Sequence, residues 1–111
     1  MGTRSDVALA IKNEAFETLS EETRSFVREW FDLAEVHDEG VLFHAKSVKW
    51  YSSYREVANF YNDLVHIPDD DFVLIEANHD DPHRGGDAGD WYNNPWGVFK
   101  EVRVAIDWCE I

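Results

Sequence analysis

The sequence predicts an α+β protein with helices on one face of an antiparallel-rich sheet. Two segments carry apolar residues at three- and four-residue steps, the pattern of amphipathic helices. Short apolar runs precede, separate and follow these segments, as strands do. The last of them, from Val98 to Trp108, alternates apolar and polar residues like an antiparallel strand with one wet face. The length of 111 residues and the hydrophobic content of 44% predict a single domain, 1–111.

The first half of the chain predicts a buried strand, a helix and a short strand. Ser5 to Ile11 is almost entirely apolar, which favours a central strand buried on both faces. A helix is expected from about Glu14 to Phe31. Ser20, which precedes two glutamates, is a helix N-cap signal inside this segment, so the helix can also break in two there. A short strand is then expected from Leu33 to His37.

The next segments predict a hairpin, a second helix and a further strand. Gly40 is expected to supply the left-handed residue of a turn at 38–40, before a longer strand from Val41 to Tyr51. The capping box Ser53-x-x-Glu56 opens the second helix. Its expected apolar face consists of Tyr54, Val57, Ala58, Tyr61, Leu64 and Val65. Pro68 and three aspartates end it, and a strand follows from Phe72 to Ala77.

The resulting order is strand, helix, strand, strand, helix, strand, with one extra strand at the end. The first six elements match the split βαβ arrangement that is known as ferredoxin-like. The expected fold is therefore a ferredoxin-like βαββαβ domain with an extra C-terminal antiparallel strand and two helices on one face of the sheet.

The charge balance limits the class of partner. Acids outnumber bases 23 to 10, which gives a formal charge of −13. Such a charge argues against direct contact with nucleic acid or an anionic membrane and favours a basic protein partner, a cation or a merely soluble surface. The single Cys109 cannot form an internal disulfide, and neither a signal peptide nor a membrane-spanning run is visible. These features predict a cytoplasmic location.

The stretch from Asn78 to Gly97 follows no helical or strand period, because Gly, Pro, Asn and Asp break both. Acids and large aromatic residues on a long loop are typical of a binding surface. Together with a preceding acidic run, the predicted partner-binding residues are Asp69, Asp70, Asp71, Asp80, Asp81, Asp87, Asp90, Trp91, Tyr92 and Trp96. The alternative for the three aromatic residues is that they fold back and plug one end of the core.

No residue pattern predicts catalysis. His79 and His83 have a spacing that binds zinc on a helix, but Pro82 and the neighbouring glycines exclude a helix here. Cys109 lies beside Glu110, and an acidic neighbour raises the pKa of a thiol and makes it a weaker nucleophile. The sequence motif of a serine nucleophile elbow is absent. We therefore expect a protein without catalytic residues, metal or cofactor.

A pattern of aliphatic and aromatic residues runs through the middle of the chain. It comprises Val41-Leu42-Phe43, Val48-Lys49-Trp50-Tyr51, Ser53-Tyr54-Arg55-Glu56-Val57 and Phe72-Val73-Leu74-Ile75-Glu76 with a run of acids, after an opening Gly2-Thr3-Arg4. This pattern resembles a group of small acidic proteins encoded by tailed bacteriophages. The resemblance implies a phage accessory protein of α+β fold and carries no catalytic site across.

The expected function is binding and inhibition of a host nucleic-acid-handling or defence protein in the host-cell cytoplasm. Such enzymes present basic channels to phosphates, and a folded acid-rich surface can occupy these channels in place of the polyanion. Two alternatives stay open. One is a small metal-dependent enzyme that uses the His and Asp residues of the 79–90 loop, and the other is a homodimer or larger homo-oligomer with a structural or ligand-binding role.

Overall fold

An antiparallel sheet with strand order β2-β3-β1-β4-β5 organises the chain. The computed structural model describes residues 4–51, 53–79, 87–91 and 93–97. In this part of the chain the strands are β1 (Ser5–Lys12), β2 (Leu33–Val36), β3 (Gly40–Val48), β4 (Phe72–Asn78) and β5 (Ala88–Gly89). The helices are α1 (Asn13–Glu17), α2 (Glu21–Trp30), α3 (Arg55–Leu64) and the short 3-10 helix η1 (Asp69–Asp71). These elements confirm the α+β class.

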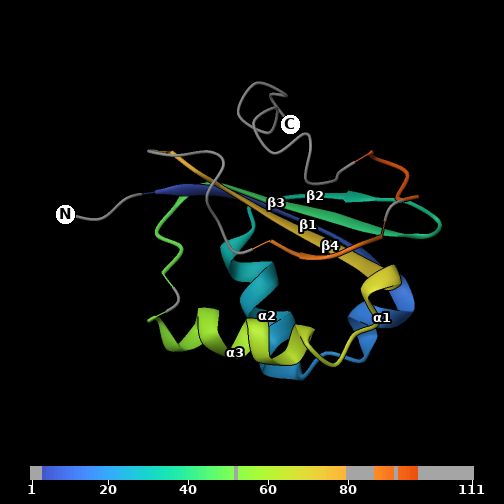
Figure 1. Ribbon diagram of the computed structural model, residues 1–111, viewed down its shortest axis with the longest axis horizontal. Coiled ribbons are helices and arrows are strands. Elements are labelled where there is room, and N and C mark those ends of the chain that lie inside the picture. The colour runs from blue at the N-terminus through green and yellow to red at the C-terminus, as the bar shows by residue number, and fades with distance from the viewer. Residues whose placement is uncertain (1–3, 52, 80–86, 92, 98–111) are drawn as a thin grey trace.

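β1 is central because its apolar sequence can be buried on both faces. It pairs antiparallel with β3 on one side and with β4 on the other. β1 and β2 therefore run in the same direction with β3 between them, and β3 and β4 run in the same direction with β1 between them. All three α-helices lie on one face of the sheet (Figure 1). The opposite face is called the helix-free face below.

The first predicted helical segment forms two helices. Thr18 donates its hydroxyl to the Ala15 carbonyl at the end of α1. The Ser20 hydroxyl accepts a hydrogen bond from the Thr23 amide at 3.2 Å and caps α2. The break that Ser20 signals in the sequence is therefore confirmed, and the single continuous helix is wrong.

The second predicted helix begins without its expected capping box. Tyr54 is the N-cap of α3, and no side chain caps this end, so the expected role of Ser53 is wrong. The buried stripe consists of Val57, Phe60 and Leu64. Val65, which lies just beyond the helix, is 76% exposed and does not belong to this stripe.

Gly40 is needed for space rather than for a left-handed backbone. Among the described residues, positive φ angles occur at Ser47, Gly89 and Gly97 and not at Gly40. A Cβ atom at Gly40 would clash with the Ile11 carbonyl oxygen and lie 3.0 Å from the Trp91 ring. The expected role of Gly40 in the turn is therefore wrong, because the close approach of β1 dictates the glycine.

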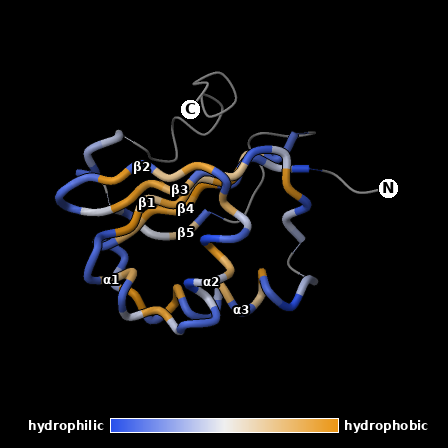
Figure 2. The backbone as a smooth tube through the Cα atoms, turned by 180° about the vertical axis from the view of Figure 1, so that it is seen from behind, coloured by the Kyte–Doolittle hydropathy of each residue, from blue (hydrophilic) through white to orange (hydrophobic). Residues whose placement is uncertain are grey.

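The sheet separates two apolar cores. Val7, Leu9 and Ile11 of β1 face the helices and join the larger cluster, whereas Ala8 and Ala10 face the helix-free side. Figure 2 shows hydrophobic residues concentrated along β1, β3 and β4. No helix among the described residues is long and apolar enough to cross a membrane.

The segment after β4 differs from its prediction. β5 lies within the stretch that was expected to hold no regular element, and it pairs with Val73 and Leu74 of β4. The predicted C-terminal strand, 98–108, lies outside the described residues.

Candidate functional site

A hollow of about 580 Å³ is lined by residues of α2 and α3. Glu21, Glu22 and Glu29 of α2 and Glu56 of α3 line it, and all four are exposed. Phe26 and Trp30 supply its aromatic lining. We call this site the acidic groove.

The sequence of α2 explains why acids line the groove. Thr23, Phe26 and Val27 are buried, so the glutamates are left on the solvent side. Glu21 and Glu22 occupy the first turn, where the helix dipole favours negative charge. Glu29 lies at the opposite end of the helix, where the dipole disfavours an acid.

The aromatic lining is held by a packed cluster. The ring of Phe26 lies 4.8 Å from Trp30, 5.9 Å from Trp50 and 5.5 Å from Phe60, measured between centroids. Trp30 also meets Tyr54 edge-on at 6.3 Å. Because Phe26, Trp50 and Phe60 are buried, the wall of the groove is supported by the core.

Asp63 fixes α3 against the start of α2. Its carboxylate accepts hydrogen bonds from the Ser20 amide at 3.0 Å and from the Ser20 hydroxyl at 2.8 Å. Partial burial opposes ionisation of Asp63, but hydrogen bonds from Thr23 and Ser20 outweigh it and lower its pKa below the ordinary value. This link sets the relative position of the two helices that line the groove.

The four groove glutamates form no ion pair with a described residue. The basic residues of α2 are directed elsewhere. Arg24 donates to the carbonyls of Glu17 and Leu19 at 2.8 Å, and the Arg28 guanidinium lies 5.2 Å from the Phe16 ring. The groove can therefore accept a lysine or arginine side chain, with its aliphatic stem and its charge against the aromatic wall.

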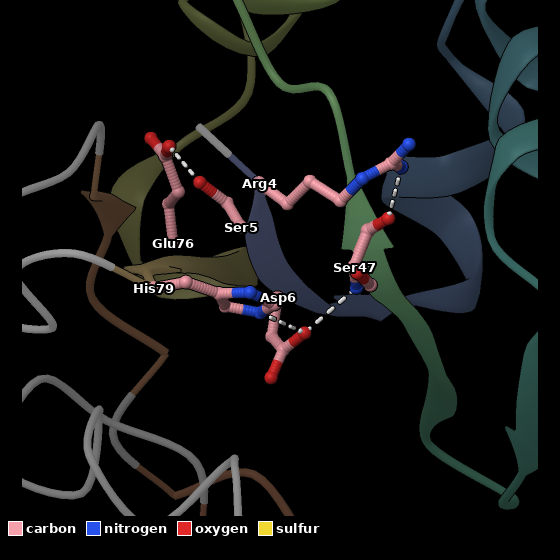
Figure 3. A network of polar contacts seen from close by, with 6 residues as sticks. All are labelled: Arg4, Ser5, Asp6, Ser47, Glu76 and His79. Carbon is pink, nitrogen blue, oxygen red and sulfur yellow. Dashed lines mark hydrogen bonds and ion pairs between the residues drawn. The ribbon is translucent and has the colours of Figure 1, made fainter. Parts of the chain in front are cut away.

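A second polar constellation lies at the end of the sheet where β1 begins and where β3 and β4 end (Figure 3). Asp6, which is 3% exposed, accepts a hydrogen bond from the Ser47 amide at 2.8 Å and contacts His79 Nε2 at 3.0 Å. Arg4 donates to the Ser47 carbonyl at 2.8 Å. The Ser5 hydroxyl donates to Glu76 at 2.8 Å. These residues are called the Asp6 network.

The geometry of Ser47 belongs to this network. Its φ of 59° is in the left-handed region, which is uncommon for a residue other than glycine. The β1–β3 register shifts between Ser5 and Val7, next to this position. The irregular backbone directs the Ser47 amide to Asp6, so the carboxylate compensates for a local departure from the strand ladder.

His44 lies near the network on the helix-free face, opposite Ala8 in the strand register. It is 1% exposed, and neither of its ring nitrogens has a hydrogen-bond partner among the described residues. Burial lowers the pKa of His44 below 6.5, while the nearby Asp6 charge acts in the opposite direction. Folding therefore favours the neutral form of His44 relative to the unfolded chain.

The Asp6 network contacts a histidine, and none of the residues that the structure describes aligns a nucleophile on it. Asp6, Lys46, Ser47 and His79 line a shallow hollow of about 290 Å³. The Ser5 hydroxyl donates to Glu76, and Ser47 contacts Asp6 through its backbone amide. A serine nucleophile would instead be hydrogen-bonded to the histidine. The visible role of the network is to join the ends of three strands.

The predicted acidic residues differ in their surroundings. Asp69, Asp70 and Asp90 are exposed, and the Asp90 amide donates to the Asp69 carbonyl at 2.7 Å, so η1 and β5 meet at one place. Asp71 contacts Lys12 at 3.3 Å. Asp87 accepts a hydrogen bond from the Glu76 amide at 3.1 Å, which gives it a structural role. Asp80 and Asp81 lie outside the described residues.

Trp91 is a core residue, so its predicted presentation to a partner is wrong. It is 5% exposed and packs in the helix-free cluster with Ala8, Leu42 and Ile75. The half-buried Trp96 meets it edge-on at 6.1 Å. Trp91 therefore follows the alternative prediction, in which the ring folds back onto the core. Tyr92 lies outside the described residues.

His79, one residue of the metal alternative, contacts Asp6 through its Nε2 atom. Within the described residues, no three side chains of the His, Cys, Asp or Glu type are placed to hold a metal ion. His83 and the other members of 80–86 lie outside that part of the chain.

Sequence reasoning missed both constellations. The groove was indicated in the sequence only by acids on the solvent side of an amphipathic helix. An ordinary exposed helix face has the same pattern, so these acids did not stand out as a site. The signal for the network was an aspartate, Asp6, at the start of an apolar strand.

Comparison with protein-family models gave no match to this chain, and comparisons with curated proteins and with solved structures gave none either.

Proposed function

We propose that this protein is a non-enzymatic binding protein that takes up a basic segment of a partner protein in the acidic groove. One observation carries the proposal: four exposed glutamates without an ion-pair partner among the described residues surround a supported aromatic wall. The net charge of −13 adds long-range attraction for a basic partner and accelerates encounter.

The proposed partner is a host nucleic-acid-handling or defence protein, which a phage-type accessory protein inhibits in the host cytoplasm. The basic channels of such enzymes have the charge that the groove and the exposed acids Asp69, Asp70 and Asp90 attract. An acidic protein seated in such a channel competes with the phosphates of the natural polyanion.

We further propose that the topology is ferredoxin-like. Two features support this assignment. A helical connection joins β1 to β2, which have β3 between them, and α3 joins β3 to β4, which have β1 between them. The α-helices share one face of the sheet (Figure 1).

Binding of a fluorescent octa-arginine peptide tests the groove directly. The variant with Glu22→Gln and Glu29→Gln should bind it about tenfold more weakly, because two desolvated charge contacts are lost. A matched control carries Glu14→Gln and Glu17→Gln, two exposed acids of α1 outside the groove. This control changes the net charge equally and should weaken binding much less.

Equal weakening by the two double variants would show that the peptide responds to total charge, and would overturn the groove as the binding site. Capture of host proteins from a lysate with the wild type and the groove variant in parallel then identifies the partner. The proposed inhibitor should recover a nucleic-acid-handling or defence protein that the groove variant does not retain.

A further inference from the structure

The β2 edge of the sheet is unusually open and acidic. β2 is the last strand on its side of the described sheet, so β3 is its only strand neighbour there. All residues from 32 to 39 are exposed, and Val36 is 82% exposed. This segment contains Asp32, Glu35, Asp38 and Glu39 and no lysine or arginine.

The register shows which backbone groups face the open side. His37 and Gly40 exchange two backbone hydrogen bonds, at 2.9 Å and 3.3 Å. Bonded and non-bonded pairs alternate in an antiparallel ladder, so Glu35 bonds to β3 and its neighbours in sequence do not. The amides and carbonyls of Ala34 and Val36 therefore point away from β3, toward an added strand.

Natural edge strands are usually protected by short length, by charged side chains, especially lysine, by proline or by an overlying element. β2 is short, its sequence Leu-Ala-Glu-Val holds one charge, Glu35, and its four residues are left exposed by the described part of the chain. The negative charge of Glu35 attracts a basic strand rather than excluding it. We propose that this edge binds an extended basic segment of the partner protein as an additional antiparallel strand. This inference rests on the proposed basic partner and names a second contact for it, apart from the acidic groove.

The side chains of β2 define the sequence of that segment. Successive residues of a strand point to opposite faces, so Glu35 lies on the helix-free face and Val36 on the helix side, next to Val41. An incoming strand that alternates basic and apolar residues places its charges beside Glu35 and its apolar side chains beside Val36. Alternating lysine and valine satisfy both requirements.

Charge also decides between this occupant and a second copy of the chain. Pairing two β2 edges would bring together two protomers of charge −13, each with four acids in residues 32–39. Like charges that face each other across strands are destabilising. A basic strand gains attraction from the same acids, and its backbone supplies the hydrogen bonds that Ala34 and Val36 leave open.

The test uses a labelled decapeptide of alternating lysine and valine, with fluorescence anisotropy as the readout. The control peptide alternates lysine and proline, which keeps the charge but removes backbone donors. The lysine–valine peptide should bind, and the control should bind about tenfold more weakly because the strand ladder cannot form. Amide hydrogen exchange should become slower at Ala34 and Val36 on binding of the first peptide.

Two variants block the edge in different ways. Ala34→Pro removes a donor that points away from β3, and Val36→Lys adds a positive charge at a side chain that is already exposed. Each should weaken the lysine–valine peptide about tenfold and leave octa-arginine binding in the groove unchanged. Val36→Lys keeps every backbone group, so it remains informative when the proline variant fails to fold.

The outcomes separate this inference from the proposed function. Equal binding of both lysine peptides, or loss of binding only in the Glu22→Gln, Glu29→Gln variant, overturns strand addition and leaves the groove in place. Binding of the lysine–valine peptide at β2 with no octa-arginine binding overturns the groove alone. A homodimer in light scattering that Val36→Lys dissociates shows that a second copy occupies the edge, and overturns the basic segment as its occupant.

Discussion

The acids on the two sides of the sheet differ in what surrounds them. On the helix side, the groove glutamates are exposed and have no ion-pair partner among the described residues. On the helix-free face, Asp6 is 3% exposed and its carboxylate contacts Ser47 and His79. The same chemical group is thus left open for a ligand in one region and incorporated into the fold in the other.

The difference follows from the cost of burying charge. A carboxylate removed from water needs hydrogen bonds and opposite charge to compensate for its lost hydration. Asp6 receives a hydrogen bond from the Ser47 amide and a contact from His79 within the chain, so its interactions contribute to folding. The groove glutamates keep their hydration, and their attraction for cations remains available for binding. Substitutions on the two sides should therefore affect different measurements.

The largest effect is expected for Trp91→Ala. The substitution removes a buried ring from the helix-free core and should lower the free energy of unfolding by about 4 kcal/mol. Trp30→Ala is the matched change in the groove, where the ring is only half-buried. It should affect octa-arginine binding more than stability. Urea denaturation and anisotropy measure both properties, and a binding defect without a stability loss in Trp91→Ala would contradict its role in the core.

Asp6→Ala should be the next most destabilising change. It leaves the Ser47 amide without its acceptor and His79 without its carboxylate contact, at an expected cost of about 2 kcal/mol because both of these residues are exposed. The measurement is again the free energy of unfolding in urea. A loss as small as that of Glu21→Gln, which removes an exposed carboxylate, would show that Asp6 does not support the sheet end.

A pH effect is expected on the helix-free face because His44 is buried. Its folded pKa lies below the unfolded value of 6.5, so the unfolded state binds more protons as the pH falls below 6.5. The contribution of neutral His44 is complete above pH 6.5 and is lost as the pH falls toward the folded pKa. His44→Leu should flatten the dependence of stability on pH between 7 and 5.5, measured by thermal unfolding. An unchanged slope would show that His44 does not titrate with unfolding.

Local sequence patterns predicted much of the fold. The apolar run of β1 and the inward stripe of α2 are encoded within short stretches, and both form where they were expected. Gly40 was misread because its requirement comes from Ile11 and Trp91, residues that are distant in sequence. The face toward which Trp91 turns depends on the same tertiary contact, so its burial was not visible in its own segment.

The candidate site was harder to predict because its parts are separated in the chain. Asp6 lies 41 residues from Ser47 and 73 from His79, and no local pattern connects such partners. The glutamates of α2 were visible, but they form the wall of a hollow only once α3 packs beside them. Sequence acidity therefore predicted a basic partner, whereas tertiary packing was needed to locate a site for it.

The smallest expected effect is that of Glu29→Gln, which should raise the stability of the protein while it weakens peptide binding. Glu29 is an acid in the last part of α2, where the negative end of the helix dipole disfavours it. Glu29→Gln should therefore raise the free energy of unfolding by about 0.3 kcal/mol and at the same time weaken octa-arginine binding. Glu21→Gln, in the favourable first turn, should instead lower stability slightly while also weakening binding. Parallel denaturation and anisotropy measurements decide the point: if Glu29→Gln stabilised the protein without weakening the peptide, the charge at the end of α2 would have no part in the groove.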